Sequence, residues 1–279
     1  MMVAKQGGRV QSPSSINLFK QCPRRYFYSY ILRFPTKPNI HLIRGNVVHS
    51  ALENFFDIKF STLTLDDYKL KLTKHLKQLF SQSWQSKKKE LSKLGLLQSE
   101  LEFYYEESTF MLANWLNDYL QKIKKQLDKN DNDLKFAFNR VNPLTREELY
   151  KDDELKIKGY VDAIHRDGDS EDVVVIDYKT SKKDTMTPAY RLQLGLYALM
   201  YQRKHGVMPK KVGIWFLKTG EKHIDVTQEM IQDALFEVEQ IHAATQTTVI
   251  TDYPKKVSPL CKYSTGQCDF YDMCMRERK

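Results

Sequence analysis

The most continuous hydrophobic pattern in the chain is the run Val173–Ile176, which leads directly into Asp177, Tyr178 and Lys179. An unbroken run of β-branched residues is typical of a strand that is covered on both faces. Because side chains alternate along a strand, Asp177 and Lys179 are expected on one face and Tyr178 on the other. Charges at the end of a buried strand cost several kcal/mol unless they pair or bind a metal. The sequence therefore predicts either a structural ion pair or a metal site at this point.

The hydrophobic period changes along the rest of the chain. Helical spacing dominates before residue 130 and again after Thr187, whereas strand-like runs dominate between them. The sequence Asp167-Gly168-Asp169 is typical of a hairpin turn that would place two strands side by side. The predicted elements are a capped helix from Ser14, a helix after Asn46, two or three helices over 64–130, strands at 136–138, 155–165, 173–180, 212–218 and 223–226, and helices over 187–206 and 227–245.

Composition places the chain among globular proteins. Of its 279 residues, 41% are hydrophobic and 28% are charged, which excludes a disordered or fibrous chain. The net charge of +9 attracts polyanions and modestly favours a nucleic-acid partner. The first residues contain no apolar signal region, and no apolar run approaches the ~18 residues of a membrane span. We expect a soluble, cytoplasmic protein that makes no contact with a membrane.

A second carboxylate is expected beside Asp177. Asp162 lies fifteen residues earlier, a separation that two antiparallel strands and a short turn would span. Two adjacent carboxylates repel each other, and a divalent cation relieves the repulsion; for oxygen ligands this favours Mg²⁺ or Mn²⁺. Lys179 would then lie beside the metal, where it could orient or deprotonate a water and offset charge that develops on phosphorus.

Two predicted helices carry further candidates at a spacing of four residues. His49 and Glu53 share one helix face, and Gln193 and Tyr197 share another. The spacing alone does not assign a function to either pair. A histidine beside an apolar stripe is often a packed or surface residue, and the glutamine and tyrosine could lie on an ordinary helix surface.

The order of these motifs carries a resemblance to a known family. Gly45-x-x-x-His49, Gly159-x-x-Asp162, Asp177-Tyr178-Lys179 and Gln193-x-x-x-Tyr197 resemble the RecB-like branch of the PD-(D/E)XK nuclease superfamily. The segment SSINLFKQCPRRYFYSY supplies a fifth block. The resemblance extends from about residue 12 to residue 274 and leaves only the helical stretch at 58–130 without a match.

The resemblance implies a role for each motif residue. A metal would be held by His49, Asp162, Asp177 and the main-chain carbonyl of Tyr178, and Lys179 would be the catalytic lysine. Gln193 and Tyr197 would position the lysine and the scissile phosphate. Glu53, one helical turn beyond His49, would assist a second ion.

One cysteine, Cys22, lies near the start of the chain, and the other three lie near its end: Cys261, Cys268 and Cys274. By count the four cysteines suit a 4Fe–4S cluster or a structural zinc, and four unrelated thiols are the remaining alternative. The order of one early and three late cysteines is similar to that of iron–sulfur members of the RecB-like group, namely nucleases of CRISPR adaptation and AddB-type helicase-nucleases. This similarity favours iron over zinc, although the six residues between Cys261 and Cys268 exceed the usual gap.

Together these features imply an α/β, restriction-endonuclease-like domain in which a mixed central sheet is flanked by helices. The expected segments are N-terminal helices (1–57), a helical insertion (58–133), a catalytic core (134–249) and a cysteine-rich clamp (250–279). The expected activity is Mg²⁺- or Mn²⁺-dependent hydrolysis of DNA, by an exonuclease, in repair, recombination or CRISPR adaptation. The alternative is a DNA-holding, nuclease-fold subunit of a helicase–nuclease complex that does not itself cut. The chain has no ATPase motif, so a separate helicase or CRISPR adaptation proteins are the expected protein partners.

Overall fold

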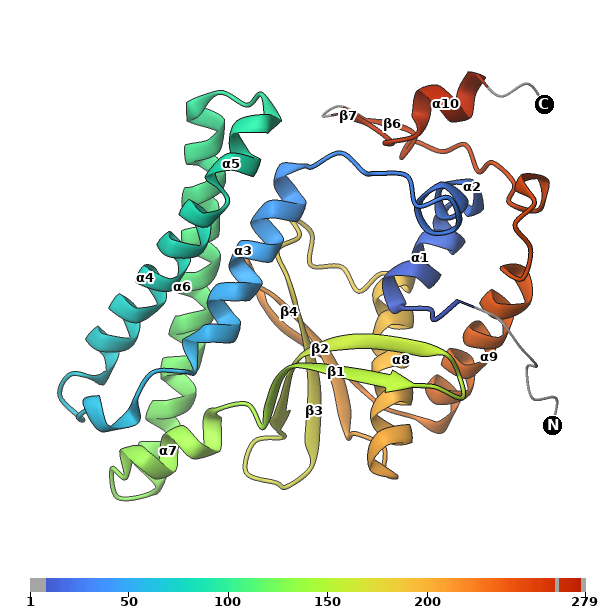
Figure 1. Cartoon of the computed structure of the whole chain (residues 1–279). Coiled ribbons are helices and arrows are strands. Elements are labelled where there is room, and N and C mark those ends of the chain that lie inside the picture. The colour runs from blue at the N-terminus through green and yellow to red at the C-terminus, as the bar shows by residue number, and fades with distance from the viewer. Residues whose placement is uncertain (1–8, 264–265, 277–279) are drawn as a thin grey trace.

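The computed structural model describes residues 9–263 and 266–276. Residues 1–8 of the predicted N-terminal segment, and 264–265 and 277–279 of the predicted C-terminal clamp, lie outside the described residues. A five-stranded sheet in the order β1-β2-β3-β4-β5 forms the centre of the chain (Figure 1). Its strands are β1 (Thr145–Asp152), β2 (Ile157–Arg166), β3 (Val173–Lys179), β4 (Lys211–Phe216) and β5 (Gly220–Asp225).

The sheet is mixed, as the sequence predicts. The pair β3–β4 is parallel, and the other three neighbouring pairs are antiparallel. Parallel neighbours need a crossover connection, which α8 provides between β3 and β4. The first turn of α8 is fixed by Pro188 and by Thr187, whose side chain accepts a hydrogen bond from the main-chain N–H of Tyr190.

Helices cover both faces of the sheet (Figure 1). One face packs against α3, α4, α6 and α7 and the other against α1, α8 and α9, each through its own hydrophobic cluster. Among the described residues, no helix is both long and apolar enough to span a bilayer. The helices are α1 (Pro13–Gln21), α2 (Pro23–Tyr26), α3 (Ile40–Phe55), α4 (Tyr68–Ser86), α5 (Lys88–Leu91), α6 (Gln98–Lys129), α7 (Leu134–Val141), α8 (Pro188–His205), α9 (Gln228–Ala244) and α10 (Tyr271–Arg276), with a π-helical turn at Phe27–Ile31, 3₁₀ turns at Phe60–Thr62, Ser92–Leu94 and Ile250–Asp252, and a small hairpin of β6 (Lys262–Tyr263) and β7 (Gly266–Gln267).

One predicted strand is wrong. The segment 136–138 lies in α7, because the side chain of Asp133 accepts a hydrogen bond from the main-chain N–H of Phe136 and caps a helix. The first strand is instead β1, which the sequence analysis missed. β1 is an edge strand that pairs only with β2, and its sequence TREELYKD lacks the apolar alternation of a half-buried strand.

The helix that carries His49 begins earlier than predicted. It starts at Ile40, because the side chain of Asn39 accepts a hydrogen bond from the main-chain N–H of Leu42. Consequently Arg44, Gly45 and Asn46 lie inside α3 rather than before it. This difference places a glycine in the middle of a sixteen-residue helix.

The two ends of the chain meet in an aromatic cluster, which contains Tyr26, Phe27 and Tyr28 from the N-terminal helices and Tyr253 and Phe270 from the C-terminal segment. The rings of Phe27 and Tyr253 lie 4.9 Å apart, and those of Tyr28 and Phe270 lie 5.2 Å apart. Such contacts stabilise beyond the area that they bury. The cluster therefore brings the segment around Cys22 to the segment that carries the late cysteines.

The centre of the sheet tolerates no side chain at Gly213 of β4. An added Cβ would clash with Cδ2 of His223 and would lie 3.0 Å from the carbonyl oxygen of Lys222 and 3.1 Å from Cδ1 of Ile176. We expect Gly213→Ala to lower the free energy of unfolding by about 1–3 kcal/mol, as overpacking does. Urea denaturation measures this change. Gly45→Ala is the matched control, since its added Cβ meets only Oγ1 of Thr180 at 3.9 Å; equal loss in both variants would contradict the steric reason.

Candidate active site

The carboxylate of Asp177 lies at the end of β3 and is only 2% exposed. Its Oδ2 is 2.6 Å from Nζ of Lys179, and its Oδ1 accepts a hydrogen bond of 2.8 Å from Nε2 of Gln193. Lys179 and Asp177 therefore share one face of the strand, the face covered by α8. The free-energy cost of burying the carboxylate is offset here by one cation, Lys179, and one amide donor, Gln193.

Gln193 and Tyr197 reach this carboxylate from successive turns of α8. Nε2 of Gln193 also donates to the hydroxyl oxygen of Tyr197 at 3.0 Å. The amide thus links the tyrosine to Asp177. The structure brings together these residues, which were separate motifs in the sequence, in the order lysine, aspartate, glutamine and tyrosine.

Asp162 and His49 meet at the main chain of Tyr178. Oδ2 of Asp162 accepts a hydrogen bond of 2.7 Å from the N–H of Tyr178, and Nε2 of His49 lies 2.9 Å from the Tyr178 carbonyl oxygen. Nδ1 of His49 is 3.4 Å from Oδ2 of Asp162. The imidazole, the carboxylate and the carbonyl that the sequence predicts as metal ligands therefore lie in mutual contact.

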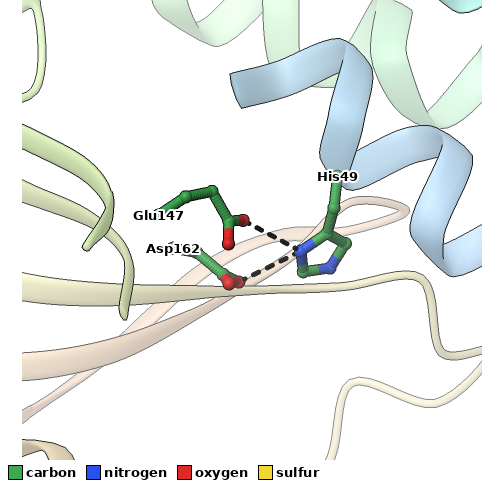
Figure 2. Close-up of side chains that lie close together, drawn as sticks. All are labelled: His49, Glu147 and Asp162. Atoms are coloured by element: carbon green, nitrogen blue, oxygen red, sulfur yellow. Dashed lines mark ion pairs between the residues drawn. The ribbon is translucent and has the colours of Figure 1, made fainter. Parts of the chain in front are cut away.

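The sequence analysis missed a third group in this cluster, Glu147. Figure 2 shows Glu147 and Asp162 both directed at one ring nitrogen of His49, with Oε1 of Glu147 3.8 Å from Nδ1. His49, Glu147 and Asp162 each offer one ligand atom, and these three atoms lie within 4.8 Å of one another. A metal ion could be held at this point, where two carboxylates and an imidazole provide suitable donors.

The sheet register explains how Glu147 reaches the site. Arg146 pairs with Ala163 and Glu148 pairs with Val161, so Glu147 is opposite Asp162 across the β1–β2 pair. Its φ of 43° lies in the left-handed region, which is unusual for a residue other than glycine. Strained backbone of this kind concentrates at functional sites. Only recognition of β1 and its register with β2 could have revealed Glu147 from the sequence.

Glu53 lies at the edge of the same cluster. It lines an open groove of about 410 Å³ together with His49 and Glu147. Burial and the nearby carboxylate of Glu147 raise the pKa of Glu53. The structure therefore places Glu53 near a like charge, which is the arrangement that a second cation would relieve.

Burial and neighbouring charges shift the pKa values of Asp177, Lys179 and His49. Burial raises the pKa of Asp177 to about 6, against the opposing effect of the Lys179 ammonium. Burial alone would lower the pKa of Lys179, but the charge of Asp177 outweighs it and raises that pKa. Burial likewise disfavours protonation of His49, yet the carboxylates of Asp162 and Glu147 raise its pKa to about 10. Without a metal, His49 therefore carries a proton at neutral pH.

A buried arginine holds the chain just after Lys179. Arg44 of α3 donates a hydrogen bond of 2.9 Å to the carbonyl oxygen of Thr180 and forms an ion pair with Glu107 of α6. Glu107 also pairs with Lys218, which follows β4. The long helix α6, part of the segment predicted as an insertion, thus fixes the ends of the two central strands.

The four cysteines line one small cavity of about 30 Å³ between the two ends of the chain. Arg25, Lys255 and Lys256 line it as well and provide positive charge beside the thiols. Burial raises the pKa of the Cys268 thiol. Within the described residues, no three of the four sulfur atoms lie within 4.8 Å of one another, since His49, Glu147 and Asp162 alone meet that condition.

Comparison with known proteins identifies the family. The sequence model of the PD-(D/E)XK nuclease superfamily matches residues 11–275. The chain belongs to this superfamily. Among solved structures it is similar to a candidate exonuclease from Eubacterium rectale, with 14% identity, a TM-score of 0.46, and coverage of 97% of this chain and 89% of that chain. The curated proteins give no match.

Membership of the PD-(D/E)XK superfamily implies a nuclease that uses divalent metal ions. The five-stranded mixed sheet flanked by helices agrees with the fold expected from the sequence. The residues that the motifs predict for the site lie in contact at the ends of β2 and β3.

Metal binding at this cluster should depend on pH. A cation that binds His49 must displace the proton that its raised pKa retains, so affinity for Mn²⁺ should rise by up to about tenfold per pH unit between pH 6.5 and 8.5. Isothermal titration calorimetry in buffers of different ionisation enthalpy measures the number of protons released when the metal binds. In His49→Gln, which has no such proton, the affinity should be weaker and its pH dependence smaller. Identical pH dependence in both proteins would exclude His49 as a ligand.

Proposed function

We propose that the protein is a Mg²⁺- or Mn²⁺-dependent deoxyribonuclease that hydrolyses phosphodiester bonds. The observation that carries this proposal is the contact between Asp177, Lys179 and Gln193 at the end of β3, next to His49 and Asp162. A buried acid and base would pair in any fold, but a purely structural pair has no need for a neighbouring cluster of metal-ligand type. The net charge of +9 supports a polyanionic substrate.

His49, Asp162, Asp177 and the carbonyl of Tyr178 would hold the metal, and Glu147 adds a ligand that the sequence did not indicate. When bound, the metal would polarise the phosphate and lower the pKa of a water molecule. Because Glu147 and Asp162 both contribute negative charge, this site would favour a cation over an anion.

Lys179 would act as a fixed positive charge. Its raised pKa keeps the ammonium protonated at neutral pH, which suits stabilisation of charge that develops on phosphorus better than removal of a proton from water. Gln193 donates to Asp177 and Tyr197, so it would orient the carboxylate toward the metal. These two residues of α8 are thus proposed as positioning residues.

The proposed branch of the superfamily and the proposed biological process both rest on the motif resemblance. We propose a RecB-like exonuclease that acts in DNA repair, recombination or CRISPR adaptation, with any unwinding supplied by a separate helicase. Glu53, beside Glu147, would assist a second ion. A DNA-holding subunit without activity is the alternative, and the contacts of Lys179 and Asp177 argue against it.

Substitutions at β3 separate these alternatives. Lys179→Ala should reduce cleavage by about 10²-fold or more, because it removes a charge that stabilises the transition state. Asp177→Ala should abolish cleavage, yet DNA affinity should hold or increase because a negative charge near the phosphate is lost. Cleavage of end-labelled DNA and binding by fluorescence anisotropy, measured on the same preparations, test both statements.

Two controls accompany this experiment. Each variant must melt within a few degrees of the parent, and Lys183→Ala, which removes an exposed lysine after β3, should leave cleavage within about twofold since surface charges contribute little. Equal cleavage by the parent and both active-site variants would refute the nuclease assignment. Absence of cleavage with every divalent metal and every form of DNA would favour the DNA-holding alternative.

We also propose that the cysteine cavity holds a 4Fe–4S cluster, with Cys22, Cys261, Cys268 and Cys274 as ligands. The four thiols line one cavity together with Arg25, Lys255 and Lys256, which supports a site where positive side chains lie beside a negatively charged metal–thiolate group. The order of one early and three late cysteines favours iron over zinc in that site. Cluster binding would stabilise the contact between the two ends of the chain.

Protein purified without oxygen should therefore be brown. Cys22→Ser should bleach it and lower the melting temperature, because one ligand and the link between the chain ends are lost together. Visible absorption and iron and sulfide analysis measure the cluster. Ser258→Ala, in the same segment but outside the ligand set, should keep its colour. A colourless protein with one bound zinc would overturn the assignment to iron, and loss of colour in Cys274→Ser but not Cys261→Ser would exclude Cys261.

A further inference from the structure

An open groove runs along one face of α3 and includes two residues of the candidate metal cluster, His49 and Glu147. Its volume is about 410 Å³. The lining residues of α3 recur at helical spacing and are small or uncharged along much of the length. They are His41, Leu42, Gly45, Asn46, His49, Ser50 and Glu53, with Glu147 of β1 opposite.

Gly45 in this groove has no explanation within the protein. Glycine destabilises a helix interior relative to alanine. Its φ is not positive, and an added Cβ would meet only Oγ1 of Thr180 at 3.9 Å, so neither backbone conformation nor packing requires it. Gly159 of β2 differs, because a Cβ there would lie 3.0 Å from Cε of Met200 and 3.1 Å from Cε1 of Tyr197.

A molecule that approaches the helix from outside would explain the glycine. A residue without a side chain allows a ligand to lie close to the helix backbone. The groove shares His49, Glu53 and Glu147 with the cluster that is proposed to bind metal. A polynucleotide with its scissile phosphate at that metal therefore has to continue past these residues, and the groove along α3 is continuous with them.

We propose that one strand of substrate DNA lies in this groove, with its closest approach to the protein at Gly45. The amide of Asn46, next to this point, and the hydroxyl of Ser50, one helical turn after Asn46, offer uncharged donors and acceptors to the sugar–phosphate backbone. This inference rests on the proposed nuclease function and extends it, since it names the surface that holds the strand next to the scissile bond.

The test fills the groove without disturbing the fold. Gly45→Leu should fold, because helix propensity improves and the added carbons point into open space, and Gly45→Ala should raise the melting temperature by about 2–4 °C. In the full chain carrying Asp177→Ala, so that no cleavage occurs, Gly45→Leu should weaken binding of a fluorescent single-stranded oligonucleotide at least tenfold. Gly45→Ala should show a smaller loss in the same direction.

The matched control is Ala243→Leu, which adds the same side chain to an exposed position of α9. Its DNA affinity should remain that of the parent. Unchanged binding in Gly45→Leu, an equal loss in Ala243→Leu, or a loss confined to duplex DNA would overturn the inference. Hydrolysis of bis(p-nitrophenyl) phosphate by the parent protein tests the metal centre separately, so failure of the nuclease proposal is distinguished from failure of the groove.

Discussion

The arrangement of the site depends on the burial of one carboxylate, that of Asp177. At 2% exposure an uncompensated charge would cost several kcal/mol, so the surrounding structure has to supply partners for it. Lys179 supplies a cation from the same strand, and Gln193 supplies a donor from α8. The raised pKa of Asp177 shows that these partners offset burial only in part. A cation beside Asp177 would complete the compensation, which links the stability of this strand end to the proposed chemistry.

The site is assembled from both faces of the sheet. α8 contacts Asp177 from one side, while His49 of α3 contacts Asp162 and the main chain of Tyr178 from the other. Each contact needs the strand ends to be held in place. Arg44 and Glu107 fulfil this need by joining α3 and α6 to the residue that follows Lys179. The long helical segment is therefore an integral support of the site rather than a separate appendage.

The ends of the chain are joined by a different kind of interaction. Stacked and edge-on aromatic rings bring the N-terminal helices to the C-terminal segment and place the four cysteines around one cavity. The aromatic contacts join the same two segments that carry the cysteines, so they contribute to bringing the thiols together. Pre-organisation of this sort reduces the entropy that a bound cluster would have to offset.

The sequence by itself determined the mixed α/β sheet, the position of β3 and the identity of most polar residues around it. These features are local: a run of β-branched residues, a turn and a capped helix are each specified within a few neighbouring residues. The order of the short motifs likewise pointed to the superfamily that the sequence match confirms. Only the tertiary structure revealed Glu147 and Glu107, because one depends on the register of an edge strand with little apolar alternation and the other on a contact across 63 residues between two helices. The tertiary structure alone also showed that Gly45 faces a groove. From the sequence, the same glycine could equally allow close packing of another helix.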